Sequence, residues 1–323
     1  MRHATLLAAV LFGMVTCTLA LAQVPARIAW IGAGSPADEA PNLAAFRDGM
    51  REQGLHDGRH YLIEARYADG RYERFPALTD ELIRRGPALI LVRTIASVQA
   101  AQRATKAIPI VFVSTNDPVG SGLVASLARP GGNTTGLATQ AEDIIVKQVE
   151  LARETLPLAT RVAVLVNPDN PSGPNLFKSV KAAAARFGIE ARAFEASNPE
   201  SLDATFAAIS RYRPGALLTI GDSVFFDQRT QIARFAIKNS IPHFAASPEY
   251  AAAGSLMTYG TSPAAFFRRS AIYVKKILGG TKPADLPVEQ PIIFTMVINQ
   301  RTARTLGISI PPIVLLRANE VIE

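Results

Sequence analysis

Residues 108–136 read IPIVFVSTNDPVGSGLVASLARPGGNTTG, and in this stretch a run of polar residues directly follows an apolar one. The continuous apolar run at 110–113 is typical of a strand that is buried on both faces of a parallel sheet. It stops abruptly at the polar residues 114–117. The sequence therefore predicts a buried parallel strand with polar side chains at its carboxyl end.

The residues after this strand predict a helix and a candidate binding position. Pro118 suits the first position of a helix behind an Asp117 cap, and a short helix is expected over 120–128. In an open α/β sheet, ligands bind outside the carboxyl ends of the strands, where the N–H groups of helix N-termini point at them. Ser114, Thr115 and Asp117 are therefore candidate ligand-binding residues.

Similar strands alternate with helical stretches along the rest of the chain. Steady alternation of strand and helix predicts parallel sheets with helices on both faces, which is an α/β fold of the doubly wound kind. The expected strands are 27–31, 61–66, 88–92, 108–113, 161–166, 190–195, 216–220, 241–245, 255–259 and 294–298. The expected helices are 42–53, 72–84, 95–104, 143–154, 176–187, 199–211 and 225–238.

Four short motifs recur at an offset of 133 or 134 residues, at matching points of this pattern. They begin at Arg27 and Arg161, Pro41 and Pro174, Gly54 and Gly188, and Ile108 and Ile241. A repeat of this length predicts two similar lobes, each large enough to be a complete doubly wound domain.

The chain is expected to pass between these lobes more than once. One boundary is expected near 136–143, where a glycine-rich break ends and a helix begins. An extended segment at 255–260, a helix at 262–278 and a further extended segment at 291–299 predict more crossings. Several extended crossings between two lobes form a hinge, and a hinge implies a cleft that opens and closes.

The first 22 residues, MRHATLLAAVLFGMVTCTLALA, are typical of a secretory signal peptide. Arg2 gives a positive start, an apolar run extends from Thr5 to Leu21, and cleavage is expected after Ala22. The alternative is a membrane anchor, for which the apolar run is short. Export would make the protein periplasmic, and it would remove Cys17, the only cysteine.

The charge pattern argues against nucleic acid as a partner. The net charge is +7, or +6 after removal of the expected signal peptide, and the basic residues are scattered along the chain. Nucleic-acid binding would require clustered basic residues interleaved with aromatic ones. No second stretch of the sequence is long and apolar enough to predict a membrane span.

Four segments resemble a known family. They are AFRDGMREQG at 45–54, the whole of 108–136, RVAVLVNP at 161–168 and IPPIVLLRANEVIE at 310–323. They look like the corresponding parts of ABC transporter substrate-binding proteins of the tryptophan/tyrosine-associated type. The resemblance covers essentially the whole chain after the expected signal peptide.

The resemblance implies a type I periplasmic-binding fold, in which two Rossmann-like lobes are joined by three hinge crossings. It implies a first lobe of 26–137 with 258–283 and a second lobe of 139–255 with 285–323. The implied partners are a small-molecule ligand, which in this family can be an aromatic amino acid, and an ABC permease in the inner membrane. We expect a monomer that needs no cofactor and no metal.

In this fold, loops between strands and helices line the cleft: 32–36, 93–97 and 114–117 from the first lobe, and 167–170, 221–226 and 245–249 from the second. Small hydroxyl residues ahead of helix N-termini suit a carboxylate, Asp222 suits an ammonium, and Phe225, Phe226 or Tyr259 suits an apolar side chain. The candidate ligand-binding residues are Ser35, Arg93, Thr94, Ser97, Ser114, Thr115, Asp117, Asn167, Asp222, Phe225, Ser247 and Tyr259.

Each of these residues also has a structural interpretation. The Thr, Ser and Asp residues are ordinary helix caps, and only one of the adjacent Phe225 and Phe226 can face the cleft. Arg93 stands where the family resemblance implies a small residue. It either points inward and binds an anionic group of the ligand, or lies at the cleft rim with its charge in water.

The expected function is an exported solute receptor that closes on a small amino-acid-like or other carboxylate molecule. Closure follows because contacts with both lobes form only in the closed state. The alternatives are a ligand-sensing subunit for a signalling receptor and a periplasmic α/β enzyme. An enzyme is the weaker alternative, because the sequence has no dinucleotide fingerprint, Walker motif or Gly-x-Ser-x-Gly elbow.

Overall fold

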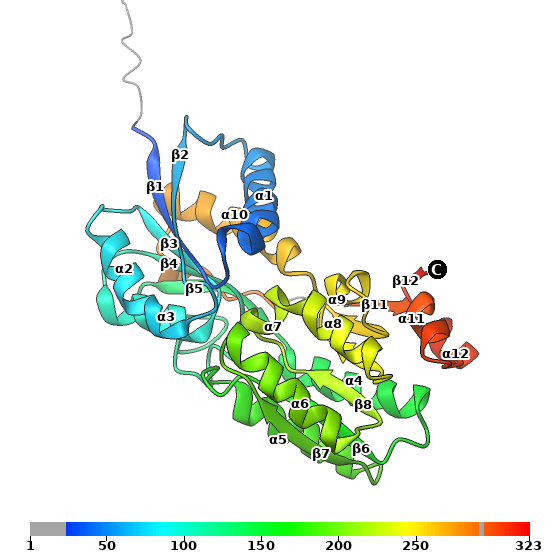
Figure 1. The fold of residues 1–323 in the computed structure, drawn as a ribbon. Coiled ribbons are helices and arrows are strands. Elements are labelled where there is room, and N and C mark those ends of the chain that lie inside the picture. The colour runs from blue at the N-terminus through cyan, green and yellow to red at the C-terminus, as the bar shows by residue number, and fades with distance from the viewer. Residues whose placement is uncertain (1–23, 291–293) are drawn as a thin grey trace, which may run out of the picture.

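The computed structural model describes residues 24–290 and 294–323, and it shows two α/β lobes with a sheet in each (Figure 1). The expected signal peptide and Cys17 lie outside the described residues. So do residues 291–293, at the start of the expected third extended crossing.

The first lobe contains a five-stranded parallel sheet. Its strands, in the order β2-β1-β3-β4-β5, are β1 (Ala26–Gly32), β2 (Tyr61–Tyr67), β3 (Leu89–Val92), β4 (Ile110–Asn116) and β5 (Thr134–Thr139). Its helices are α1 (Pro36–Glu52), α2 (Phe75–Ile83), α3 (Ile95–Ala104) and α10 (Pro263–Leu278), with a 3₁₀ turn at Tyr72–Arg74. The sheet is covered by α1 and α10 on one face and by α2 and α3 on the other (Figure 1).

The alternation of side chains along β1 explains why both faces are covered. Ile28 and Trp30 point toward α1 and α10, whereas Ala29 and Ile31 point toward α2 and α3. All four residues are at most 2% exposed. The strand is therefore apolar on both faces, as a parallel strand between two helical layers must be.

The second lobe contains a seven-stranded sheet. Its strands, in the order β12-β11-β10-β9-β8-β6-β7, are β6 (Arg161–Val166), β7 (Glu190–Glu195), β8 (Ala216–Thr219), β9 (His243–Ala245), β10 (Met257–Gly260), β11 (Thr295–Asn299) and β12 (Glu320–Ile322). The strand β11 is antiparallel to β10, and the other pairs are parallel. The helices are α4 (Ala141–Thr155), α5 (Gly173–Ala185), α6 (Leu202–Tyr212), α7 (Ser223–Asp227), α8 (Arg229–Lys238), α9 (Pro248–Ala252), α11 (Gln300–Thr305) and α12 (Pro312–Leu315).

The first five strands of each lobe have the same spatial order. In chain order the arrangement is 2-1-3-4-5 in both sheets, with β6 in the place of β1. The predicted α/β fold with two similar lobes is confirmed. In each sheet the order reverses between the first and third strands, and ligands of such folds bind beside this point.

Several local predictions were wrong. Residues 118–125 form turns and bends instead of the expected helix. Asp117 has a φ of 36° and accepts a hydrogen bond from the Gly120 N–H, and Gly122 has a φ of 69°, so the backbone leaves the helical region at both points. The strands β5 and β12 were not predicted, and the expected helix over 225–238 is broken at Gln228 into α7 and α8.

The crossings lie a few residues from their expected places. The expected first-lobe segment begins at 258, but Met257–Gly260 pairs within the second sheet and the chain leaves it only after Gly260. The expected second-lobe segment begins at 285, but the Val288 and Glu289 N–H groups donate to Leu127 and Gly136 of the first lobe. Strand pairing at the lobe edges therefore decides where each crossing begins.

Candidate ligand-binding site

A cavity of about 120 Å³ lies between the lobes at the carboxyl ends of the strands. It is lined from the first lobe mainly by residues that follow β3 and by the carboxyl end of β4, and from the second by α4 and by residues at or after the carboxyl ends of β6, β8 and β9. The lining residues are Tyr72, Arg93, Thr94, Ile95, Ser114, Thr115, Asn116, Thr139, Ala141, Ile144, Ile145, Gln148, Asn170, Ser172, Leu176, Thr219, Ile220, Gly221, Asp222, Ser223, Phe226, Ala246, Ser247, Tyr250, Thr261 and Pro263.

The structure brings six of the twelve candidate residues to this cavity and leaves six away from it. The lining residues among them are Arg93, Thr94, Ser114, Thr115, Asp222 and Ser247. The others are Ser35, Ser97, Asp117, Asn167, Phe225 and Tyr259. The loop at 32–36 does not line the cavity, although the sequence predicted that it would.

Arg93 lies inside the cavity, so the structure decides between the two directions that the sequence left open. It follows β3, and its backbone carbonyl accepts a hydrogen bond of 2.6 Å from the Thr115 hydroxyl. The guanidinium carbon lies 5.2 Å from the centre of the Phe226 ring, across the cleft. Nη1 of Arg93 is buried, and no described residue gives it a hydrogen-bond partner. A buried charged donor without a partner is costly, so this nitrogen is poised for an anionic ligand group.

Asp222 is the only acidic residue among the lining residues, and its side chain is held by hydrogen bonds from the protein. Its donors are the Tyr72 hydroxyl at 3.0 Å, Nδ2 of Asn167 at 3.2 Å, Nδ2 of Asn170 at 2.9 Å and the Val224 N–H at 2.9 Å. Burial raises the pKa of the Asp222 carboxyl, and these hydrogen bonds oppose the rise because they stabilise the charged form.

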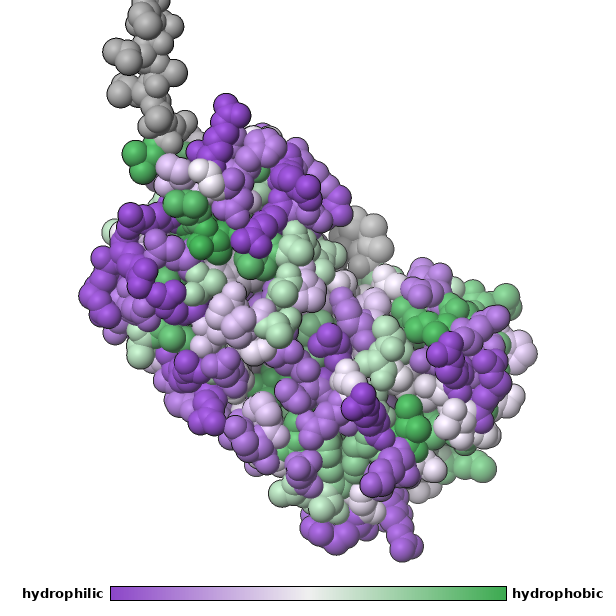
Figure 2. Space-filling view, turned by 45° about the horizontal axis from the view of Figure 1, so that its top comes forward, coloured by the Kyte–Doolittle hydropathy of each residue, from purple (hydrophilic) through white to green (hydrophobic). Residues whose placement is uncertain are grey.

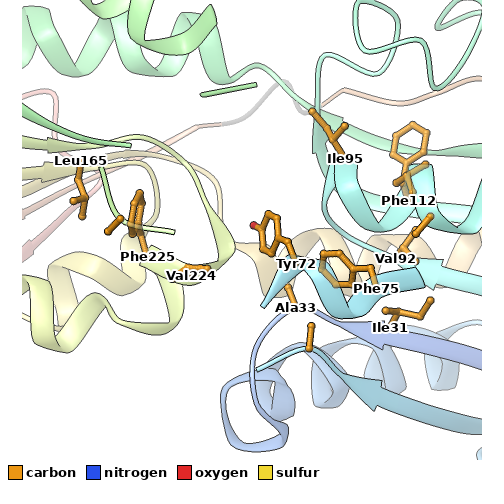
Figure 3. Packing of buried hydrophobic residues seen from close by; sticks show 14 of the residues in the cluster. Ile31, Ala33, Tyr72, Phe75, Val92, Ile95, Phe112, Leu165, Val224 and Phe225 are labelled. Atoms are coloured by element: carbon orange, nitrogen blue, oxygen red, sulfur yellow. The ribbon is translucent and has the colours of Figure 1, made fainter. Parts of the chain in front are cut away.

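Tyr72 connects the lobes across the cleft. It follows β2 in the first lobe, and in Figure 3 its ring points toward Val224 and Phe225 of the second lobe. Its hydroxyl donates to Asp222, and burial followed by the nearby Asp222 charge raises its pKa well above the usual range, so it stays a neutral donor. The neighbouring Arg71 forms a 2.8 Å ion pair with Glu200 of the second lobe. These contacts exist only while the lobes are together.

Ser114 occupies an unusual position in β4. It has a φ of 58° where the register with β5 shifts between Val113 and Thr115. Such bulges redirect side chains, and left-handed backbone is strained for residues other than glycine. The Ser114 hydroxyl lines the cavity without a hydrogen bond to any described residue.

Two further polar side-chain atoms of the cavity lack partners. The hydroxyl of Ser247, which is 4% exposed, makes no hydrogen bond within the described chain, and neither does Oε1 of Gln148, which is 1% exposed. Buried polar groups normally have partners. Their position in the lining indicates that a ligand supplies those partners.

The aromatic predictions need two corrections. Phe225 is fully buried in the core of the second lobe near Leu165, and Phe226 lines the cavity instead (Figure 3). Adjacent residues on the short helix α7 point about 100° apart, which separates them. Tyr259 stacks on Phe294 with ring centres 5.6 Å apart, away from the cavity.

The remaining candidates have structural roles, which correct their assignment as lining residues. Ser35 forms a capping box with Asp38 at the start of α1, and Ser97 forms one with Thr94 at the start of α3. Asp117 stabilises the turn after β4. Asn167 donates to Asp222 and so positions a lining residue without lining the cavity itself.

Sequence analysis missed Tyr72, Gln148 and Tyr250. The helix α4 places Ile144 and Gln148 on one face, four residues apart, which is a signal for a helix that packs against a site. No comparable signal marks Tyr72 or Tyr250, since their approach to Asp222 and Phe226 depends on how distant segments pack.

Two features are absent from residues 24–290 and 294–323. No group of three or more His, Cys, Asp or Glu side chains in these ranges could hold a metal ion. No helix in the same ranges has the length and hydropathy needed to cross a membrane.

In the view of Figure 2, hydrophobic residues on the surface lie in small patches among hydrophilic ones.

Two α/β lobes with a cavity between the carboxyl ends of their strands have the architecture of the type I periplasmic-binding fold. Residues 39–322 match the family described as ABC transporter substrate binding protein. The chain belongs to this family.

Several proteins are similar to the chain across most of its length. A tyrosine-binding protein of Clostridioides difficile is 24% identical over 272 residues, which cover 83% of this chain and 78% of that protein. The structure of a conserved domain protein from Vibrio cholerae has a TM-score of 0.84 at 27% identity and covers 92% and 99% of the two chains. A Streptococcus pneumoniae ABC domain in complex with L-Trp has a TM-score of 0.81 at 22% identity, with 91% and 100% covered.

Proposed function

We propose that this protein is the exported solute receptor of an ABC uptake system and closes on a small amino-acid-like or other carboxylate molecule. The observation that carries the proposal is the cavity between the lobes, in which Arg93 of one lobe faces Phe226 of the other. Its unpaired Nη1 suits a carboxylate, and the aromatic side chains suit an apolar body.

The mechanism follows from the distribution of these groups over two lobes. One moving body comprises the sheet β1–β5 with its helices and α10, and the other comprises the sheet β6–β12. A ligand that touches Arg93 and Ser247 at the same time binds the closed form better than the open one, so it shifts the population toward closure. The closed pair of lobe surfaces is then the form that a permease recognises.

The proposal is tested by a thermal-shift screen of the protein from residue 23 onward against amino acids, aromatic acids, dicarboxylates, nucleosides and sugars. A ligand at a hundred times its dissociation constant stabilises the fold by about 2.7 kcal/mol. Small-angle X-ray scattering should show compaction with the same ligand, and the ligand should be recovered unchanged. Turnover of the ligand, or stabilisation without any change in scattering, would contradict a closing receptor.

The transport role needs a separate measurement in cells. Uptake of the radiolabelled ligand is expected to fall when the gene is deleted and to return with the wild-type gene. Normal uptake in the deletion strain, combined with loss of a transcriptional response to the ligand, would favour the sensing alternative.

A further inference from the structure

Two charged side chains line the cavity. One has all of its hydrogen-bond positions occupied by the protein, and the other has a buried nitrogen without a partner. Arg93 and Asp222 are the only charged residues among the described lining residues. A carboxylate has about four lone-pair positions, and Asp222 uses all four. Oδ1 accepts from Asn167 and Val224, and Oδ2 accepts from Tyr72 and Asn170. Asp222 therefore has no acceptor position left for an ammonium group of a ligand.

The side chain of Arg93 differs from that of Asp222 because its hydrogen-bond donors are not used by the protein. No described residue forms a hydrogen bond or an ion pair with its side chain, and its Nη1 is buried. Arg229 also lies beside the Phe226 ring, with its guanidinium carbon 4.7 Å from the ring centre, but it does not line the cavity and its Nη1 donates to the Phe226 carbonyl oxygen. A ligand oxyanion at Arg93 gains a charge-assisted hydrogen bond from the buried, unpaired Nη1.

The other unpaired groups of the lining include no free carboxylate to pair with an ammonium. An ammonium has three N–H donors. The unpaired groups that can accept are Oε1 of Gln148 and the hydroxyls of Ser114 and Ser247, and all three are neutral. The rest of the lining combines apolar and aromatic side chains, with Ile95, Leu176 and Phe226 among them, and uncharged hydroxyl and amide side chains.

We infer that the ligand class of this site is a small monocarboxylate with an aromatic or other apolar body, whose recognition does not depend on an ammonium group. The inference rests on the proposed receptor function and narrows its ligand from amino acids to acids that lack the α-amino group. Arg93 is the residue that selects the carboxylate. Asp222 acts as a structural acceptor that holds the cleft together through Tyr72.

The experiment uses isothermal titration calorimetry with two matched series of ligands. Each series contains an amino acid, the same molecule without its amino group, and the same molecule without its carboxylate: L-tyrosine, 3-(4-hydroxyphenyl)propionate and tyramine; and L-tryptophan, indole-3-propionate and tryptamine. At least one acid without the amino group is expected to bind as tightly as its parent amino acid or tighter. The amines are expected not to bind.

Four variants test the roles of the side chains. Arg93→Ala should weaken binding of the acids about tenfold to a hundredfold, as expected for loss of a hydrogen bond to a charged group, and Arg93→Lys should weaken it less. Arg229→Ala, the matched control at the other arginine beside Phe226, should change affinity by no more than about twofold. Gln148→Glu places a free carboxylate at the unpaired acceptor and should shift preference toward the amino acids.

The outcomes separate this inference from the proposed function. An amino acid that binds more than tenfold tighter than its deaminated partner overturns the inference and leaves the receptor function standing. Binding by Arg93→Ala that equals the wild type also overturns it. If no compound of either series binds but another solute from the broad screen closes the lobes, the inference alone fails. If no solute closes them, both proposals fail.

Discussion

At the scale of single residues, His243 shows how burial controls charge near the site. It is 1% exposed, and its ring nitrogens lie 2.7 Å from the hydroxyls of Thr219 and Ser255. Burial lowers its pKa from 6.5 to about 3. Since Thr219 lines the cavity, a neutral His243 connects β9 to the carboxyl end of β8 beside the cavity.

This shift predicts a pH-dependent stability. Above pH 6.5 His243 is neutral in both the folded and the unfolded protein, so it adds no pH dependence to the free energy of unfolding there. Between pH 6.5 and about 3 the unfolded chain binds a proton that the folded protein does not, and the free energy of unfolding should fall by up to about 1.4 kcal/mol per pH unit. At pH 5 the loss is about 2 kcal/mol.

Urea unfolding of the wild type and of His243→Gln between pH 5 and 7.5 measures this contribution. Between pH 7.5 and pH 5 the free energy of unfolding of the variant should fall by about 2 kcal/mol less than that of the wild type, whatever the stability of the variant at pH 7.5. His56→Gln, at an exposed histidine, is the matched control and should retain the wild-type dependence. Equal pH profiles for the wild type and His243→Gln would contradict the prediction.

At the scale of secondary-structure elements, the fifth strand of each lobe depends on a glycine. Gly136 in β5 has a φ of +153°, and a Cβ there would lie 2.0 Å from the Phe112 carbonyl oxygen. Gly260 in β10 has a φ of +156°, and a Cβ there would lie 1.8 Å from the Ala246 carbonyl oxygen. Each glycine lies close to the point where the chain leaves its lobe. A glycine packed against a backbone carbonyl oxygen therefore occurs in the fifth strand of both lobes, as expected for two similar lobes.

Alanine at either position should destabilise the protein. Both the backbone conformation and the contact with a carbonyl oxygen oppose a side chain, so Gly136→Ala and Gly260→Ala should each lower the free energy of unfolding by about 1–3 kcal/mol. Gly221→Ala is the control, because its Cβ meets no atom within 4 Å and its φ is ordinary. The idea fails if the three variants unfold at the same denaturant concentration.

The element scale also separates what sequence patterns predicted from what they missed. The strand β4 was predicted from its apolar run, and β5 was missed because its glycine and threonines lack such a run. The turns after β4 were predicted as a helix because Asp117 and Pro118 resemble a helix start. Positive φ angles at Asp117 and Gly122 prevent that helix, and a pattern of residue types does not reveal them.

At the scale of the whole molecule, the lobes also approach each other outside the cavity. A Cβ on Gly34 of the first lobe would lie 2.2 Å from Oδ2 and 2.9 Å from Cγ of Asp227 in the second lobe. The two Cβ atoms of cysteines at these positions would therefore come within about 4.4 Å, which is inside the range of a disulfide. The expected mature chain has no other cysteine.

The double variant Gly34→Cys/Asp227→Cys should lock the closed form under oxidising conditions. Ligand added before oxidation should be retained through gel filtration, whereas ligand added after oxidation should not enter. Reduction should restore exchange, and the two single-cysteine variants are the controls. Free exchange of ligand in the oxidised double variant, with the disulfide confirmed by mass spectrometry, would contradict closure between these lobes.

The sequence alone determined the α/β class, the two similar lobes and most of the loops that border the cavity, because strand and helix patterns and the order of elements are local properties of the chain. Tertiary structure alone decided which side chain of each loop faces the cavity. It turned Arg93 and Phe226 inward, placed Phe225 and Tyr259 elsewhere, and brought Tyr72 to Asp222. The physical reason is that the direction of each side chain depends on where a short helix begins and on how the two lobes pack against each other. Residues far apart in the sequence determine both.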